Sequence, residues 1–263
     1  MWFFSFFRWP FVAILFAIFG FSSPGFNSVI WMLIGGALWM IPMTLYLRAL
    51  EKEEPSRVML LVNTDSIFTL LIAATMIGER LGMNQALGFA LIFLGGVLAA
   101  IKKTEKKFHF SKAALFIIVA SFMWAFSDVI FKKYEVDFTG FWDAFKYFIL
   151  GSCIVSLLFI LNKKNRDGCT AAIKKLNTAG WILIFVTELT GVCGSIAFAY
   201  ALTLGKASLT AVFVGIQPLF VFLNGLLLSF FLKSVERESM DYFSLISKTG
   251  ALILVLLGLS YLG

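Results

Sequence analysis

Long apolar runs separated by short polar segments extend along the whole chain. The runs lie at about residues 2–21, 28–50, 56–78, 84–101, 112–134, 138–161, 177–205, 208–232 and 241–262. Runs of this length match the roughly 20 residues that a helix needs to cross a bilayer, and they lack the period-two alternation of a strand. The pattern therefore predicts an all-α polytopic membrane protein with about nine transmembrane helices.

Composition supports this prediction and removes other classes of protein. Of the 263 residues, 60% are hydrophobic and only 14% are charged, which is far from the composition of a soluble domain. The net charge of +7 would suit a nucleic-acid partner, but the Lys and Arg residues lie in short loops, where they act as topology signals. The three cysteines are isolated and lack the spacing of a metal site. We therefore expect no nucleic acid and no metal.

One passage of the chain occurs twice. The first copy has Ala49-Leu50, Ser56, Asp65 and Phe68, and the second has, at identical spacing, Ala201-Leu202, Ser208, Gln217 and Phe220. Downstream, Glu79-Arg80 with the glycines Gly88 and Gly96 corresponds to Glu236-Arg237 with Gly250 and Gly258. An internal repeat in a very apolar chain is typical of a transporter built from two pseudo-symmetric halves.

The repeat divides the chain into residues 1–103, with four predicted helices, and residues 112–263, with five. Arg8 aligns with Lys146, and no run in the first half corresponds to the run at 112–134. We expect that the chain starts downstream of a first helix; a genuine nine-helix variant is the alternative. A cleavable signal peptide fits the first run poorly because Arg8 interrupts its apolar stretch.

Basic residues predict the orientation of the helices. Most Lys and Arg residues fall on one side, in clusters at 48–57, 102–112, 163–175 and 233–248. The other side carries Arg80, Lys132, Lys133 and Lys206. The positive-inside rule places the first set in the cytoplasm and the C-terminus outside. Because a full repeat has five helices, the second copy is inverted, which is the geometry for alternating access.

Few ionisable residues lie deep in the apolar runs, where a charge is costly and is read as functional by default. Asp65 lies beside Asn63, and its repeat partner is Gln217. We interpret Asp65, Asn63 and Gln217 as polar positions that face a cavity near the two-fold axis. Hydrogen bonds between helices are the alternative.

Asp128 shares one helix face with Ser121, Trp124 and Lys132. This polar stripe with one Trp predicts a cavity-facing surface, for which Trp124 and Asp128 are candidate binding residues. A local Asp128–Lys132 pair is an equally weighted alternative.

Glu188 lies near the middle of its run, on a face with Gly191 and Ser195. Its repeat partner is Gly36, so this acid breaks the symmetry of the halves. A lone acid in a membrane must be paired in space, protonated or hydrated. We predict that Glu188 binds substrate or carries a proton.

Arg8 and Lys146 occupy equivalent positions within the runs. They could pair with the deep acids, but we expect both to snorkel to the headgroups. Asp143 is a local partner for Lys146, three residues earlier.

An aromatic stripe is the candidate wall of the pocket, with plain packing as the alternative. The stripe consists of Trp31, Gly35, Trp39, Pro42 and Tyr46, of which Trp39 and Tyr46 are candidate binding residues. Pro42 and Pro218 leave backbone carbonyls unpaired and permit bends.

The acid–base pairs Glu79-Arg80 and Glu236-Arg237 come at helix ends on opposite sides of the membrane. Each could latch a helix end in one transport state, and a solvated loop pair is the alternative. The glycine pairs are interpreted as close-packing positions.

Together these features resemble the EamA-type family of the drug/metabolite transporter superfamily. The resemblance rests on Ala201-Leu202, Ser208, Pro218 and Phe220, on the turn Gly78-Glu79-Arg80-Leu81, on the glycine pairs and on the segment 122–127. It implies ten helices in two inverted repeats around a central cavity, and export of amino acids, metabolites or toxic organic compounds. Two features depart from the family pattern: the missing first helix, and Ser66 where the second repeat has Pro218. The predicted external C-terminus also differs, because family members usually have both termini in the cytoplasm.

We therefore predict a secondary active transporter that exports small organic metabolites or amino acids by alternating access across the plasma membrane. Proton coupling through Glu188, Asp128 or Asp65 belongs to this prediction. The expected partners are a small-molecule substrate, the lipid bilayer, protons and a second copy of the chain in a homodimer, with no cofactor.

Three alternatives remain open. A nucleotide-sugar or lipid-linked sugar carrier would need basic residues in its cavity, for which only Arg8 and Lys146 are candidates. A non-transporting membrane partner subunit would explain the missing helix. A membrane enzyme is disfavoured because the sequence has no hydrolase or nucleotide-binding motif, so we expect no enzymatic activity.

Overall fold

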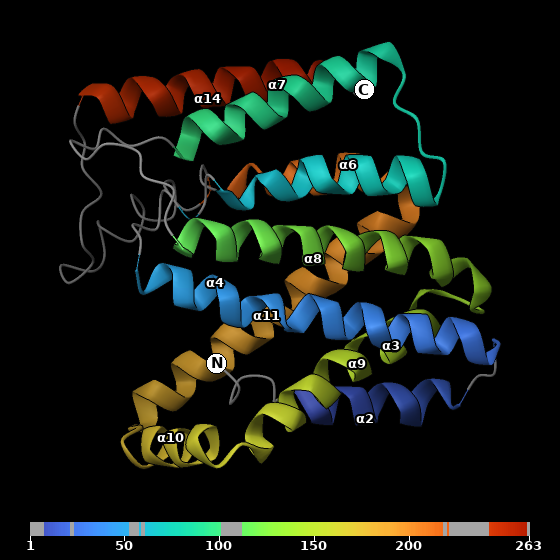
Figure 1. Cartoon of the computed structure of the whole chain (residues 1–263), viewed down its shortest axis with the longest axis vertical. Helices are drawn as coiled ribbons and strands as arrows, with labels where there is room; N and C mark the ends of the chain where they lie inside the picture. The colour runs from blue at the N-terminus through green and yellow to red at the C-terminus, as the bar shows by residue number, and fades with distance from the viewer. Residues whose placement is uncertain are drawn as a thin grey trace. The chain divides into compact units, whose positions relative to one another are not determined.

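The computed structural model describes residues 8–21, 24–52, 58, 61–100, 112–217, 220 and 242–261. Every regular element in these ranges is a helix (Figure 1). The helices are α2 (Arg8–Phe19), α3 (Phe26–Met40), α4 (Pro42–Leu50), α6 (Thr64–Met76), α7 (Met83–Ala100), α8 (Lys112–Tyr134), η1 (Glu135–Asp137), α9 (Phe141–Leu161), α10 (Lys163–Lys174), α11 (Thr178–Leu204), α12 (Ala207–Val214) and α14 (Tyr242–Ser260). The predicted all-α class is confirmed.

Four segments of the described chain are long and apolar enough to cross a membrane. They are Phe26–Leu50, Ala114–Asp137, Phe141–Leu161 and Thr178–Leu204, and shorter apolar helices lie at Arg8–Phe19, Thr64–Met76, Met83–Leu98 and Thr249–Ser260. These segments fall within the predicted runs or overlap them. α10 is an addition: its polar sequence, read as a loop, forms a helix of 12 residues.

Local sequence explains where several helices begin and end. The Asn177 side chain accepts a hydrogen bond from the Gly180 N–H at 2.8 Å, which satisfies one of the free amides at the start of α11. α6 is followed by Gly78 at φ +67°, a left-handed conformation that favours glycine. Pro42 has no N–H to donate, and α3 passes into α4 at this residue.

The chain forms two compact units, each with helices from both predicted halves. The first unit comprises residues 1–41 and 126–205, and the second comprises residues 42–125 and 206–263. One boundary lies at the α3–α4 junction and another lies inside α8.

In the first unit, α3 packs along α9 at a distance that only glycine permits. A Cβ atom built on Gly36 would overlap the carbonyl oxygen of Phe148, and one built on Gly151 would overlap that of Leu33. α2 packs against the same α9. This arrangement brings Trp39 of α3 beside Arg8 of α2, whose side chain contacts Glu188 of α11, as described below.

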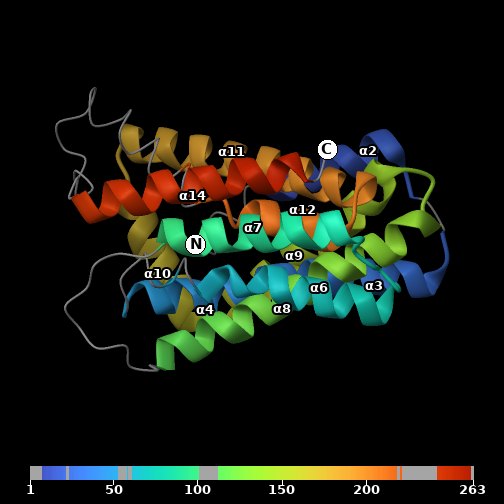
Figure 2. The same cartoon turned by 90° about the horizontal axis from the view of Figure 1, so that it is seen from above.

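In the second unit, α7 and α14 lie side by side (Figures 1 and 2), and α12 packs on α6. A Cβ atom on Gly258 would lie 2.9 Å from the Gly88 carbonyl oxygen, and one on Gly96 would overlap the carbonyl oxygen of Gly215. The close-packing interpretation is thereby confirmed for Gly96 and Gly258.

Candidate functional site

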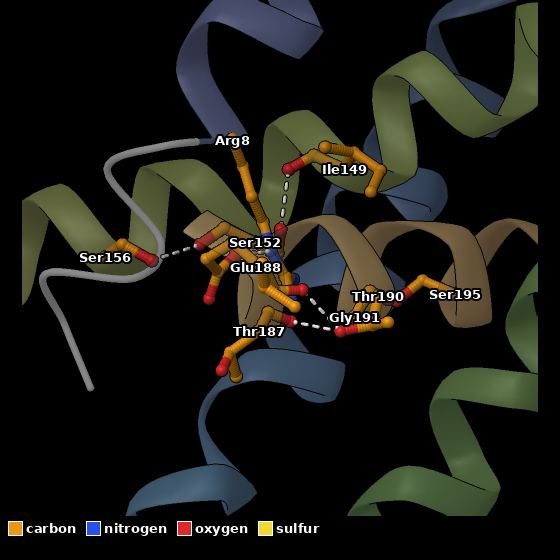
Figure 3. Close-up of polar contacts among 10 residues, drawn as sticks. Arg8, Ile149, Ser152, Ser156, Thr187, Glu188, Thr190, Gly191 and Ser195 are labelled. Carbon is orange, nitrogen blue, oxygen red and sulfur yellow. Dashed lines mark hydrogen bonds and ion pairs between the residues drawn. The ribbon is translucent and has the colours of Figure 1, made fainter. Parts of the chain in front are cut away.

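Arg8 and Glu188 form an ion pair between α2 and α11. The Arg8 Nε–H donates to Glu188 Oε2 at 3.4 Å, and the two side chains are 10% and 13% exposed. Figure 3 shows Arg8 reaching from α2 toward Glu188. A charge this deep in an apolar segment is costly without a partner, so each group stabilises the other.

Trp39 completes this site from α3. The guanidinium carbon of Arg8 lies 4.9 Å from the centroid of the Trp39 ring, within the range of a cation–π interaction. The Arg8 Nη1 atom is buried and has no hydrogen-bond partner among the described residues. A guanidinium carries five N–H donors, so Arg8 retains donors for an anionic group beyond its contact with Glu188.

Small and hydroxyl-bearing residues surround the pair. A Cβ atom on Gly191, one turn from Glu188, would lie 4.0 Å from Arg8 Nη2, in ordinary van der Waals contact. The hydroxyls of Ser152, Ser156 and Ser195 bond to backbone carbonyls of their own helices, as the dashed lines in Figure 3 show for several such contacts.

The expectation that Arg8 and Lys146 snorkel is wrong. Arg8 pairs with Glu188, and Lys146 is fully buried. The Lys146 ammonium donates to Asp143 Oδ1 at 2.5 Å and to the Gly20 carbonyl at 2.7 Å. The local Asp143 partner is confirmed. Snorkelling fails because closer partners are at hand: Glu188 of α11 for Arg8, and Asp143 of α9 with the Gly20 carbonyl for Lys146.

Asn63 and Asp65 form a second polar position, in the second unit. Both are buried at the start of α6, and neither Asn63 Nδ2 nor Asp65 Oδ1 has a hydrogen-bond partner among the described residues. Gln217 is exposed, just beyond α12. The interpretation of these three residues as binding positions stays a prediction.

Tyr46 and Trp124 meet in the second unit. Their ring centroids lie 5.9 Å apart in an edge-to-face arrangement. Asp128 is buried further along α8, and the Lys132 ammonium donates to the Thr203 carbonyl at 3.0 Å. Binding roles for Tyr46, Trp124 and Asp128 stay predictions.

Glu79 contacts the start of α12. Its carboxylate accepts hydrogen bonds from the Ala207 N–H at 2.9 Å, from the Ser208 N–H at 3.1 Å and from the Ser208 hydroxyl. The Arg80 side chain is exposed, and its carbonyl accepts from Lys206 Nζ at 2.5 Å. The remaining predicted helix-end residues, Glu236, Arg237 and Pro218, lie outside the described residues.

The comparisons with known proteins identify the family. The sequence model of the EamA-like transporter family matches residues 1–101 and 111–256. The chain belongs to the EamA-like transporter family. It is therefore a multi-pass membrane transporter of the drug/metabolite type, with a small-molecule substrate and the bilayer as its surroundings.

Structural comparison agrees with this membership at the level of fold. A solved structure described as "Crystal structure of protein" matches 99% of this EamA-like chain and 94% of its own chain, with a TM-score of 0.61 and 15% sequence identity. At that identity the likeness concerns the fold alone. No curated protein gives a significant match to the EamA-like chain.

Proposed function

We propose that this EamA-like protein is a secondary active transporter, which exports amino acids or similar zwitterionic metabolites across the plasma membrane by alternating access. The Arg8–Glu188 pair carries the proposal. It is mostly buried within apolar helices, one guanidinium nitrogen has no hydrogen-bond partner among the described residues, and the small residue Gly191 lies beside it.

A zwitterion matches the chemistry of this pair. The carboxylate of the zwitterion would accept hydrogen bonds from Arg8, and its ammonium would pair with Glu188. When Arg8 and Glu188 separate, each side chain would therefore still have an opposite charge beside it. The Trp39 ring would pack against an apolar side chain of the solute. Proton coupling follows from the same site, because Glu188 released from Arg8 would take up a proton in its apolar surroundings.

A sugar-phosphate or nucleotide-sugar carrier is less well supported. It would need uncompensated positive charge for phosphate, and both predicted cations are paired with acids. Lys146 is bonded to Asp143, and Arg8 is bonded to Glu188.

Ligand-induced stabilisation tests the proposal. The purified protein in mild detergent is screened with amino acids, polyamines, nucleotide sugars and sugar phosphates, because a ligand that binds the folded state raises the unfolding temperature. We expect stabilisation by an amino acid that is lost in Glu188→Gln and Arg8→Gln and retained in Thr190→Val, a control on the exposed side of the same helix.

Transport in proteoliposomes then tests direction and coupling. We expect uptake of the stabilising amino acid to depend on an imposed pH gradient in wild type and to lose this dependence in Glu188→Gln. Stabilisation by sugar phosphates instead, or an unchanged response in both variants, would contradict the proposal.

A further inference from the structure

The segment Asn63–Thr69 concentrates the unsatisfied polar groups of the described structure. Among the described residues, five buried side-chain nitrogen or oxygen atoms have no hydrogen-bond partner. Three of the five lie in this segment: Asn63 Nδ2, Asp65 Oδ1 and Thr69 Oγ1. Asp65 is 9% exposed, Asn63 5% and Thr69 0%. A buried polar group without a hydrogen-bond partner destabilises the fold. Three such groups in one short segment therefore require an explanation.

Thr69 differs from the other hydroxyl residues of its helix. The Thr75 hydroxyl bonds to the Leu71 and Ile72 carbonyls, and the Thr64 hydroxyl bonds to the Leu61 carbonyl at 2.6 Å. The Ser66 hydroxyl donates to the Ala211 carbonyl of α12 at 3.1 Å. Only Thr69, among these, leaves its hydroxyl oxygen unbonded although it is fully buried.

Two of the three side chains, those of Asp65 and Thr69, can reach one ion. Asp65 and Thr69 are four residues apart on α6, so their Cβ atoms lie on one face about 5–6 Å apart. Asn63 has helical backbone angles two residues before Asp65, so its side chain points to another face, toward Gly96 and Gly215. Carboxylate, amide and hydroxyl oxygens are the ligands of hard cations.

A single turn residue, Asn63, separates helical residues 61–62 from α6. Its backbone angles are helical, and the Ser121 hydroxyl lies 3.5 Å from the carbonyl oxygens of Leu61 and Val62. Asn63 lies against two glycines: Cβ atoms on Gly96 and Gly215 would come within 3.1 Å and 3.4 Å of its amide atoms.

We propose that Asp65 and Thr69 form a binding site for a monovalent cation, with Na⁺ as its ligand. The single carboxylate favours one positive charge. No Lys or Arg forms an ion pair with Asp65 among the described residues, and no group of three or more His, Cys, Asp and Glu there could hold a metal ion. The site belongs to the second unit and is independent of the Arg8–Glu188 pair.

Binding of ²²Na⁺ to the purified protein in detergent tests the proposal directly. Thr69→Val removes the hydroxyl and keeps the side-chain shape, Thr69→Ser keeps the hydroxyl, and Thr75→Val is the matched control on the same helix. We expect saturable binding in wild type, Thr69→Ser and Thr75→Val. Thr69→Val should raise the half-saturating Na⁺ concentration at least tenfold, and Asp65→Asn should abolish binding.

Thermal unfolding in NaCl against choline chloride, at constant ionic strength, gives an independent readout that needs no solute. A rise in unfolding temperature with Na⁺ that is lost in Thr69→Val supports the site even if Asp65→Asn does not fold. No saturable ²²Na⁺ binding in wild type, equal binding in Thr69→Val and wild type, or stabilisation that follows pH alone would overturn the proposal. Because no amino acid is present, failure here leaves the proposed export function intact.

Discussion

The carboxylate of Glu79 accepts a hydrogen bond from the backbone N–H of Ser208, 129 residues later in the chain. With the bond from the Ala207 N–H, it satisfies two amides at the start of α12 that have no partner within the helix. A negative charge also interacts favourably with the positive end of the helix dipole. Glu79, predicted with Arg80 as a helix-end latch and alternatively as part of a solvated loop pair, therefore caps a distant helix.

Removing this cap should destabilise the second unit. We expect Glu79→Ala to lower the free energy of unfolding by about 1–3 kcal/mol, because two amides and a hydroxyl lose a charged acceptor. Glu79→Gln should cost less, since its carbonyl oxygen can still accept. Thermal unfolding in detergent measures both variants.

Arg80→Ala is the matched control. Its side chain is exposed, and its contact with Lys206 uses the backbone carbonyl, which the substitution keeps. A loss of stability in Arg80→Ala as large as in Glu79→Ala would contradict the capping role.

Gly36 should tolerate no side chain. A Cβ atom there would overlap the Phe148 carbonyl oxygen, and neither backbone can turn away as a flexible side chain would. We expect Gly36→Ala to lower stability by about 1–3 kcal/mol or more through overpacking. Gly194→Ala is the comparison, because nothing lies within 4 Å of its Cβ position. It should be neutral or stabilising by up to about 1 kcal/mol, since alanine favours a helix interior. Equal unfolding temperatures for the two variants would contradict the close approach of α3 and α9.

Sequence alone predicted the helices well because each apolar run carries its own signal. It also indicated the close-packing glycines, since their spacing recurs in both halves. It could not predict that Arg8 pairs with Glu188, because that contact joins residues 180 positions apart and depends on how α2, α9 and α11 pack. The unsatisfied hydroxyl of Thr69 was missed for a related reason: a threonine in a helix is ordinarily satisfied by its own backbone.

The binding roles of the candidate residues also depend on how the helices pack, and these roles stay predictions. Asn63 and Asp65 are two residues apart in the sequence, and both are buried at the start of α6, as two polar residues in one apolar run could suggest. Trp39 reaches Glu188 only through Arg8, which the sequence placed at the headgroups.

The buried Lys146–Asp143 pair should behave as one unit. Lys146 is fully buried, and Asp143 also accepts from the Thr139 hydroxyl at 3.0 Å. We expect Lys146→Met to lower the free energy of unfolding by about 3–5 kcal/mol, because it leaves Asp143 buried without its cation. Adding Asp143→Leu should restore part of that loss, since the uncompensated charge is then removed.

A double-mutant cycle measures this coupling from thermal unfolding of the wild type, the two single variants and the double variant. Lys133→Met serves as the control, because Lys133 is exposed at the end of α8 and should change stability by less than about 0.5 kcal/mol. Strictly additive losses in the cycle would show that Lys146 acts through its bond to the Gly20 carbonyl rather than through Asp143.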